Sequence, residues 1–510
     1  MKKIEWMVAA GAVAALAGAM YSAGCVNTAS DCTLLGTACS GGGGSTSSTT
    51  TTSTTASTTA TASVSASASS STGTGGADAL TSCEGSRFGD MNDQAARSVL
   101  VGTSGDVLLA GDFHGTLSIG IDTVNASSSA AADLFVARLD ANQQPKWLAS
   151  FAVSYGAVAR DAAGGVVLAG SYVNSPSFKG SCAPLDATNN FYLAKLDIDG
   201  KCQWAKSFKL GSPDAHANLA VDPNGNIALV GDAVGPMDFD TSDSATLQLI
   251  GNNPGLRDIF AVQLDPMGKV IKAVGFGGKG DDVANGVAFD AAGGMVITGT
   301  FQSAQIDFGS GLLKNASGLD HAFVAGILGV KGFSLDFAAT AMGAQHAMAV
   351  VVAGGLAIVA GDYTGTLGTL TSTGTALFLL GIDPATGKQA WGKSFDGKGT
   401  KSITAGAASA DGVIALTGSL EGDVDLGGSV PLSSAGGAIV ATFKPDGTTV
   451  SHLAFGDATS APLAGGVSFQ GSSILVAGSF ATKLDLGNSV TVDSAGGTDM
   501  FVAKLGKLCP

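Results

Sequence analysis

The side chains that could do chemistry in this chain are aspartates and histidines in short, glycine-containing segments at 89–93, 211–216, 278–282 and 455–457. Carboxylates that converge with a histidine could bind a hard cation such as Ca²⁺, or a cationic ligand. The alternative is that these groups only form a solvated polar rim. The candidate ligands in these segments are Asp90, Asp93, Asp214, His216, Asp281 and Asp282.

Motifs that would indicate a particular reaction are missing from the sequence. None of the five histidines belongs to a His-x-x-x-His or His-Glu-x-x-His pattern. No Gly-x-Ser-x-Gly elbow lies at a strand-to-helix turn. The stretch 275–280 is glycine-rich like a phosphate loop, but no helical pattern follows it, which favours a plain connection. We therefore predict no cofactor apart from the Ca²⁺ option.

The elements that would position these residues are repeats of roughly 60 residues. One apolar stretch that ends in glycine marks each copy. It is followed by Asp, Ser or Thr, as in Ala-Leu-Val-Gly231-Asp. The seven marker glycines are Gly111, Gly170, Gly231, Gly299, Gly361, Gly418 and Gly478.

Each copy has the pattern of four short strands. In the third copy the apolar runs are 217–222, 227–230, 258–264 and 270–276. The turns between the first two and the last two runs are Pro-Asn-Gly-Asn and Asp-Pro-Met-Gly, whose residue types favour tight turns. Four-stranded antiparallel units repeated radially are the blades of a β-propeller. The sequence therefore predicts an all-β protein with a seven-bladed β-propeller.

The two ends of the repeat array complement each other. A phenylalanine closes the fourth strand of each unit, but the first of them precedes the first complete unit, and the last unit stops after its third strand. The segment that begins at Cys83 should therefore supply the fourth strand of the last blade and close the ring. An open solenoid is the alternative, but it needs atypical capping repeats at both ends. The closing residues are Phe88, Phe151, Phe208, Phe276, Phe337, Phe395 and Phe455.

The best copy of the repeat, 221–231, reads Val-Asp-Pro-Asn-Gly-Asn-Ile-Ala-Leu-Val-Gly. It resembles the seven-bladed propeller repeat found in many bacterial secreted and surface proteins. Looser copies lie at 161–165 and 290–294, and only Gly354-Gly355 is left in the fifth unit. The resemblance covers residues 83–510. It implies the fold, but no single activity and no catalytic residue.

The N-terminal segment indicates export. Met1-Lys-Lys is basic, and the apolar run 7–19 is short for a membrane span. Ser22-Ala-Gly-Cys25 resembles a bacterial lipoprotein signal, which implies a signal peptide at 1–24 and a lipid on Cys25. The protein would then be anchored in the outer membrane or at the cell surface. Ordinary cleavage with secretion, and retention of an uncleaved helix, are the alternatives.

Residues 25–78 are predicted to be a tether between this anchor and the propeller domain at 79–510. From 41 to 77 they are nearly all Ser, Thr, Gly and Ala. Such a composition cannot bury enough apolar surface to offset the entropy of ordering, so we expect disorder.

With Cys25 set aside, six cysteines remain of the seven in the chain, an even number that suits an oxidising compartment. Repeat alignment places Cys83 and Cys509 where other blades have a covalent turn, so a bond between them would close the ring. Cys182 and Cys202 form a plausible local pair in the second blade, which leaves Cys32 to pair with Cys39. A zinc site at Cys25, Cys32 and Cys39 is disfavoured by spacing and by the absence of a nearby histidine.

Charge and aromatic residues narrow the range of functions. The net charge is −15 with only 13% charged residues, which disfavours binding to nucleic acid. Trp147, Trp204 and Trp391 share one repeat position, so we interpret them as structural rather than sugar-stacking. We predict a monomeric, non-catalytic surface module that presents loops to an unknown protein or glycan. The alternative is an exported enzyme, lyase- or hydrolase-like, with its site at the mouth of the central channel.

Overall fold

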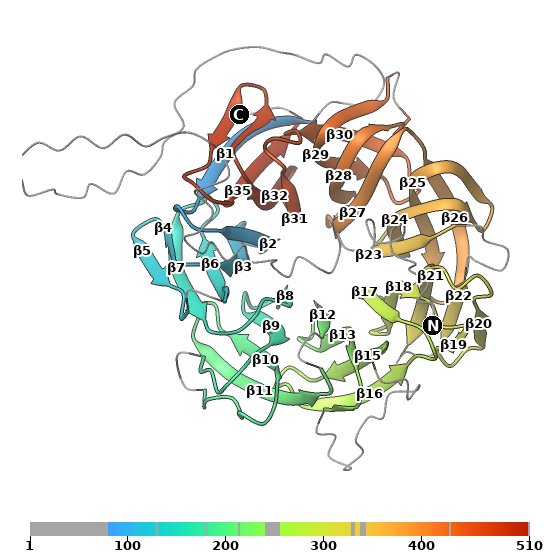
Figure 1. Cartoon of the computed structure of the whole chain (residues 1–510), viewed down its shortest axis with the longest axis horizontal. Coiled ribbons are helices and arrows are strands. Elements are labelled where there is room, and N and C mark those ends of the chain that lie inside the picture. The colour runs from blue at the N-terminus through green and yellow to red at the C-terminus, as the bar shows by residue number, and fades with distance from the viewer. Residues whose placement is uncertain are drawn as a thin grey trace, which may run out of the picture. The chain divides into compact units, whose positions relative to one another are not determined.

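The computed structural model describes residues 80–128, 131–178, 180, 182–212, 215–239, 255–327, 332–336, 343–427 and 430–507. Within these ranges the chain forms seven main antiparallel sheets around a central axis (Figure 1). The predicted all-β, seven-bladed β-propeller is therefore confirmed. The same ranges contain no helix that could cross a membrane. The predicted signal peptide at 1–24 and the tether at 25–78 lie outside the described residues.

Each blade has four main strands, of which the first lies next to the central axis and the fourth at the periphery (Figure 1). Blade 1 consists of β2 (Gln94–Val101), β3 (Val107–Phe113), β6 (Asp133–Leu139) and β7 (Pro145–Phe151). Blade 2 consists of β8 (Ala157–Arg160), β9 (Val166–Ser171), β10 (Phe191–Leu196) and β11 (Cys202–Leu210). Blades 3 and 4 consist of β12 (His216–Val221), β13 (Ile227–Val234), β15 (Arg257–Leu264), β16 (Val270–Phe276), and of β17 (Asp282–Phe289), β18 (Met295–Phe301), β21 (His321–Ile327), β22 (Phe333–Asp336). Blade 5 consists of β23 (Gln345–Ala353), β24 (Leu356–Leu367), β25 (Leu370–Asp383) and β26 (Lys388–Phe395). Blade 6 consists of β27 (Gly399–Ala408), β28 (Ile414–Val424), β29 (Leu432–Phe443) and β30 (Thr449–Phe455). Blade 7 consists of β31 (Leu463–Gln470), β32 (Ser473–Phe480), β35 (Asp499–Gly506) and β1 (Thr81–Phe88).

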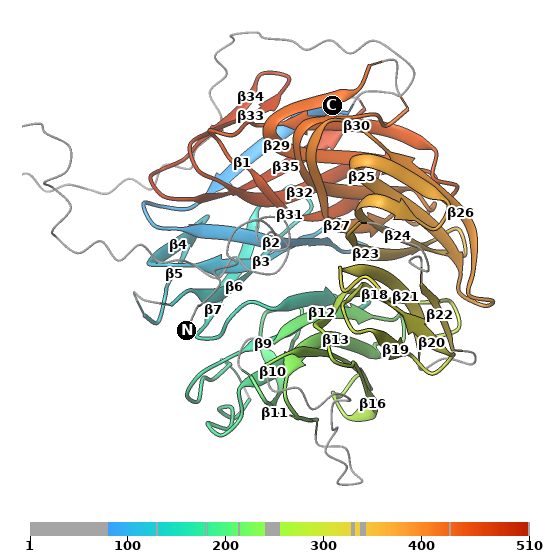
Figure 2. The same ribbon diagram turned by 45° about the vertical axis from the view of Figure 1, so that its right-hand side comes forward.

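The ring is closed by the strand that the sequence predicted. β1 is the outer strand of blade 7 and pairs antiparallel with β35, from Thr81 opposite Gly506 to Phe88 opposite Met500. Figure 2 shows the blue β1 beside the red β35, so segments from opposite ends of the chain share one sheet. This pairing removes an open sheet edge and excludes the linear solenoid.

The connections between the second and third strands differ from blade to blade. Three blades carry a separate outer hairpin, and in blade 3 the connection contributes β14 (Met237–Asp238) to the edge of blade 2. In blades 5 and 6 the main strands themselves continue outward as arms. We call residues 364–375 the blade 5 arm, and residues 421–427 with 430–435 the blade 6 arm. The hairpins are β4–β5 (Thr116–Ile119, Asp122–Asn125), β19–β20 (Gln305–Asp307, Leu312–Lys314) and β33–β34 (Lys483–Gly487, Val490–Asp493).

Steric crowding explains the marker glycines of the repeat. A Cβ on Gly361 would lie 1.8 Å from the carbonyl oxygen of His346 on the inner strand and 2.9 Å from a ring carbon of Phe378 on the third strand. Five other marker glycines meet an inner-strand carbonyl in the same way, at 1.8 to 2.0 Å, and Gly170 meets the carbonyl of Ser154, just before the inner strand, at 2.4 Å. Only glycine allows the two backbones this approach. In blades 1, 4, 5, 6 and 7 the inner strand also has a β-bulge at this point.

Neighbouring blades are joined by apolar cores and by side-chain hydrogen bonds. The closing phenylalanines lie in the core clusters between blades, such as Phe208 against Phe239, while Phe337 lies outside the described residues. Trp147 Nε1 donates to the carbonyl of Ile198, and Trp204 Nε1 to that of Pro266, each in the next blade. Trp391, at the same repeat position, packs against a core cluster, but its Nε1 has no hydrogen-bond partner. These contacts agree with the structural role that we predicted for the three tryptophans.

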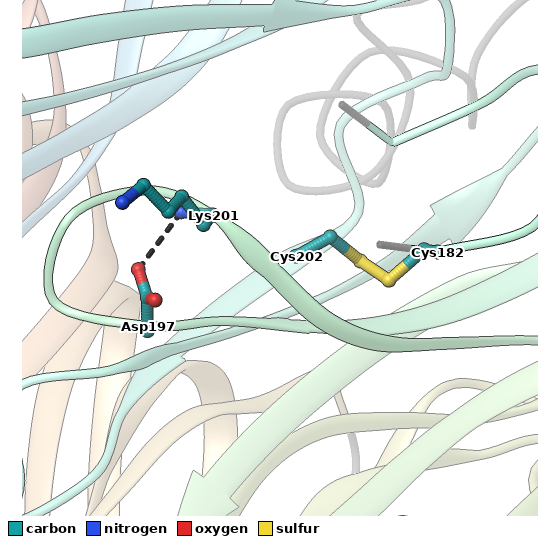
Figure 3. Close-up of a disulfide and its surroundings, with 4 residues drawn as sticks. All are labelled: Cys182, Asp197, Lys201 and Cys202. Atoms are coloured by element: carbon teal, nitrogen blue, oxygen red, sulfur yellow. Dashed lines mark hydrogen bonds between the residues drawn. A yellow bond between two sulfur atoms is a disulfide. The ribbon is translucent and has the colours of Figure 1, made fainter. Parts of the chain in front are cut away.

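One predicted disulfide is confirmed. Cys182 and Cys202 are bonded, with their Cα atoms 5.8 Å apart, and the bond ties the loop before β10 to the start of β11 (Figure 3). Beside it, the amide of Lys201 donates to Asp197 Oδ1 at 2.9 Å in the preceding turn. Cys83 is also a disulfide cysteine, but its partner is not among the described residues, so pairing with Cys509 stays a prediction. Cys25, Cys32 and Cys39 also lie outside the described residues.

Candidate functional site

The predicted ligands Asp90 and Asp93 both form hydrogen bonds that fix the loop before blade 1. Asp90 Oδ1 accepts hydrogen bonds from the amide of Asn92 and from Gln94 Nε2 at 2.8 and 2.7 Å. Asp93 Oδ1 accepts one from the amide of Thr498 at 2.8 Å, which joins blade 7 to the start of blade 1. Asp214 lies outside the described residues.

His216 lies in an ion cluster at the start of blade 3. Its Nδ1 is 3.3 Å from Asp232 Oδ1, and Arg257 Nη1 is 2.5 Å from Asp232 Oδ2. Asp232 is fully buried, and it follows the marker glycine Gly231 directly. The cluster therefore joins the first three strands of blade 3.

Asp281 and Asp282 begin blade 4 in two different environments. Asp281 Oδ1 accepts a hydrogen bond from the amide of Arg257, which links the start of blade 4 to the third strand of blade 3. Asp282 is fully buried and accepts from Ser303 Oγ at 2.6 Å and from the amide of Gly278 at 3.0 Å. Burial raises the pKa of Asp282 to about 6, although these hydrogen bonds oppose the rise.

Asp258, which the sequence analysis did not single out as a ligand, lies close to Asp282. It is 3% exposed and is the second residue of β15. Burial and then the charge of Asp282 raise the pKa of Asp258 to about 7. Its Oδ1 is buried and has no hydrogen-bond partner. Two carboxyl groups from adjacent blades are therefore held together without a compensating cation among the described side chains.

A third cluster joins blades 4 and 5 around His346. Its Nδ1 is 2.7 Å from Asp362 Oδ2 within blade 5, and its Nε2 is 3.2 Å from Asp320 Oδ2 in blade 4. Burial alone would lower the pKa of His346, but the hydrogen bonds and charges of Asp320 and Asp362 raise it to about 10. The imidazole is therefore a cation at neutral pH and cannot act there as a general base.

The stability of the ring should fall between neutral and alkaline pH because His346 loses its proton. Its folded pKa, about 10, is above the unfolded value of 6.5, so its contribution is complete below pH 6.5 and is lost as the pH rises through 10. The whole shift corresponds to about 5 kcal/mol, of which about 4 kcal/mol is lost between pH 7 and pH 10.5. Denaturant unfolding at pH 7 to 10.5 should show this decline in the wild type and a clearly smaller one in His346→Gln. Equal declines in both proteins would contradict the assignment.

The five predicted ligands that the structure describes do not form one centre. Among the described residues, no group of three or more His, Cys, Asp or Glu side chains has an arrangement that could hold a metal ion by itself. The structure instead separates Asp90 and Asp93 from the blade 3–4 junction, where Asp281 and Asp282 meet Asp258. The residues missed by sequence reasoning are Asp232 and Asp362, which follow marker glycines, together with Asp258 and Asp320 at the third strands and Arg257.

A groove lies beside the blade 5 arm. It has a volume of about 500 Å³ and lies between this arm and the loop that leads into blade 6. Hydrogen bonds between Lys398 and Asp423 fix this loop. Residues 370–372 and Ala376 of β25 pair with β24 on one side, and no residue of 370–376 pairs with β26 on the other. Its lining is polar and includes no aromatic residue: Thr371, Ser372, Thr373, Gly374, Asp396, Gly397 and Lys398.

Comparisons with known proteins find only distant structural similarity. No protein-family model matches the chain, and no curated protein matches it. A protein of unknown function from Dyadobacter fermentans has 8% identity over 84% of this chain and 99% of that one, with a TM-score of 0.40. The quinohemoprotein alcohol dehydrogenase ADHIIG of Pseudomonas putida HK5 has 10% identity over 84% and 76%, with a TM-score of 0.37. YCF48, solved with a D1 peptide, has 10% identity over 82% and 94%, with a TM-score of 0.37.

Proposed function

We propose that this chain is a non-catalytic binding module, exported and held at the cell surface by a lipid on Cys25, which captures an extended segment of another protein. The observation that carries this proposal is the groove beside the blade 5 arm. It combines the strand edge at 370–372, which is not paired to β26, with exposed hydroxyl and charged side chains. Beyond this stretch the main chain of Gly374 is bonded to Ser372 Oγ, and the carbonyl of Thr375 accepts from Lys401. An extended peptide can add a strand to such an edge, where main-chain hydrogen bonds supply affinity and the neighbouring side chains supply specificity.

The ionic clusters at the channel mouth favour binding over catalysis. His346 is held as a cation between two carboxylates, and Asp232 is bonded to both His216 and Arg257. A catalytic acid or base needs a side chain that can reach a substrate in an accessible pocket. A glycan is the other ligand that the sequence admits. A groove without an aromatic ring offers a sugar hydrogen bonds but no stacking surface.

The proposal can be tested with the unanchored Cys25→Ser protein, which we expect in the cell-free fraction while the wild type stays with the membranes. This protein is screened against a phage-displayed peptide library and an array of bacterial surface oligosaccharides. We expect peptide ligands whose affinity falls about tenfold in the Thr373→Ala/Lys398→Ala variant. The matched control, Lys483→Ala/Thr491→Ala in the blade 7 hairpin, should bind as the parent does.

Two results would count against the proposal. Oligosaccharide hits that depend on Thr373 and Lys398 would make the groove a glycan site. Peptide hits that are insensitive to the groove variant would move the binding surface elsewhere on the ring.

A further inference from the structure

The junction between blades 3 and 4 brings together two carboxyl groups that the protein's own side chains do not neutralise. Asp258 is 3% exposed and Asp282 is fully buried. The amide of Gly278 donates to Asp282 Oδ2 at 3.0 Å and also acts on the pKa of Asp258, so both carboxyl groups lie near the loop between β16 and β17. Asp258 Oδ1 has no hydrogen-bond partner, although a buried carboxylate oxygen normally has one.

No cationic side chain is recorded in an ion pair with either carboxyl group within the described ranges. Arg257, which precedes Asp258, directs Nη1 to Asp232 at 2.5 Å. Asp281 lies close enough to add a third negative charge that repels Asp258. An isolated buried carboxylate costs several kcal/mol, so two of them require a counter-charge or must keep a proton.

Two equivalent places in other blades contain a cation. In blade 7 the residue that corresponds to Asp258 is Asp499, whose Oδ1 is also without a hydrogen-bond partner but whose Oδ2 has Arg87 Nη1 at 3.4 Å. Between blades 5 and 6 the residue that corresponds to Asp282 is Lys401. Its ammonium donates to the carbonyls of Thr375, Gly397 and Gly399 at 2.6 to 3.4 Å.

The comparison with blades 5 and 6 is close because the two connecting loops match. Segments 276–282 and 395–401 have the same length, and both contain Gly-Lys-Gly, in Phe-Gly-Gly-Lys-Gly-Asp-Asp and Phe-Asp-Gly-Lys-Gly-Thr-Lys. Loop 395–401 therefore places the ammonium group of Lys401 at this position of the ring. Loop 276–282 places the carboxylate of Asp282 at the equivalent position.

We propose that Asp258 and Asp282 bind a Ca²⁺ ion that ties blade 3 to blade 4. The free Oδ1 of Asp258 supplies a ligand, and the carboxylate of Asp282 supplies another. The carbonyl oxygens of Gln302 and Gln305 also border the loop, beside Gly280 and Gly278. Ca²⁺ fits better than Mg²⁺, because it accepts irregular sets of oxygen ligands whereas Mg²⁺ demands an octahedron. With two protein carboxylates the site belongs with weak extracellular sites, whose dissociation constants are about 10⁻⁴ to 10⁻³ M.

Thermal unfolding of the EDTA-treated mature protein tests the site. At 10 mM CaCl₂ we expect the midpoint of the wild type to rise by about 2 °C, and the same concentration of MgCl₂ to have a clearly smaller effect. Asp258→Asn and Asp282→Asn should each lose the Ca²⁺ response. Asp307→Asn removes a carboxylate from an exposed turn of blade 4, and should keep the response.

Terbium luminescence on the wild type provides a readout that needs no variant, because bound Tb³⁺ should be displaced by Ca²⁺ at millimolar concentration. A wild type that responds to neither ion would overturn the proposal, and so would an equal Ca²⁺ response in Asp258→Asn and the wild type. If the wild type ignores Ca²⁺ and Asp258→Asn is the more stable protein at pH 8, the two carboxyl groups share a proton instead of a metal.

Discussion

Gly361→Ala is expected to destabilise the ring by about 3 kcal/mol or more, although it adds a single methyl group. The new Cβ would lie 1.8 Å from the carbonyl oxygen of His346, which is backbone and cannot rotate away. Relief would require β23 and β24 to separate at the point where His346 faces Asp362. The same change would therefore weaken the ion cluster that joins blades 4 and 5.

Guanidinium unfolding, followed by tryptophan fluorescence, measures this effect. Gly332→Ala is the matched control, because a Cβ there would meet its nearest atom at an ordinary 3.6 Å. The control should unfold within about 0.5 kcal/mol of the wild type. If Gly361→Ala also stayed within that range, the marker glycine would reflect something other than the close approach of two backbones.

This close approach explains why the sequence predicts the fold so well. Three features recur in the repeat: the glycine, the phenylalanine that packs on it from the third strand, and the tight turns. They recur because the blades share the same packing geometry. Gly231 and Phe260 meet in blade 3 as Gly361 and Phe378 do in blade 5. Ring closure was predictable for the same reason, since β1 and β35 each contain one part of a repeat whose complete form is visible elsewhere.

The site was less predictable because its residues meet across blades. His216, Asp281 and Asp282 were identified from acidic loops, but Asp258 and Asp320 lie at the start of third strands, where the sequence gives no sign of their neighbours. The pairing of Asp258 with Asp282 depends on how two sheets twist against each other. The grouping of Asp90 with Asp282 assumed that all loops converge, whereas each loop fastens its own junction.

The blade 5 and 6 arms were also not evident from the repeat. They lie in the most variable part of each unit, where residues 364–375 continue the pleat of β24 and β25 instead of forming a separate hairpin. The alternating Thr and Ser residues of this stretch suit a solvent-exposed strand as well as a loop. The groove that supports the proposed function therefore could not be predicted from the sequence, because it depends on how β24 and β25 pair.

Asp106→Asn is expected to cost about 3–5 kcal/mol, because Asp106 compensates two arginines at the junction between blades 1 and 2. Asp106 Oδ2 is 2.8 Å from Arg138 Nε and 2.6 Å from Arg160 Nη2, and all three side chains are at least four-fifths buried. Burial alone would raise the pKa of Asp106, but hydrogen bonds from Ser104, Arg138 and Arg160 hold it well below its usual range. The variant would leave two guanidinium groups facing each other without a counter-charge.

This junction depends on the ionic triad more than others do, because its inner strand is short. β8 has four residues, whereas the inner strands of the other blades have six to ten. Denaturant unfolding at pH 7 should show the full cost of Asp106→Asn. The difference from the wild type should shrink below about pH 4, because protonation of the aspartate in the unfolded chain then reduces the stability that the Asp106 carboxylate contributes. Asp140→Asn, which breaks a surface pair with the half-exposed Lys146, should leave the midpoint unchanged. Equal effects of the two variants would mean that the packing of β8 against β2, and not the triad, holds blade 2 in the ring.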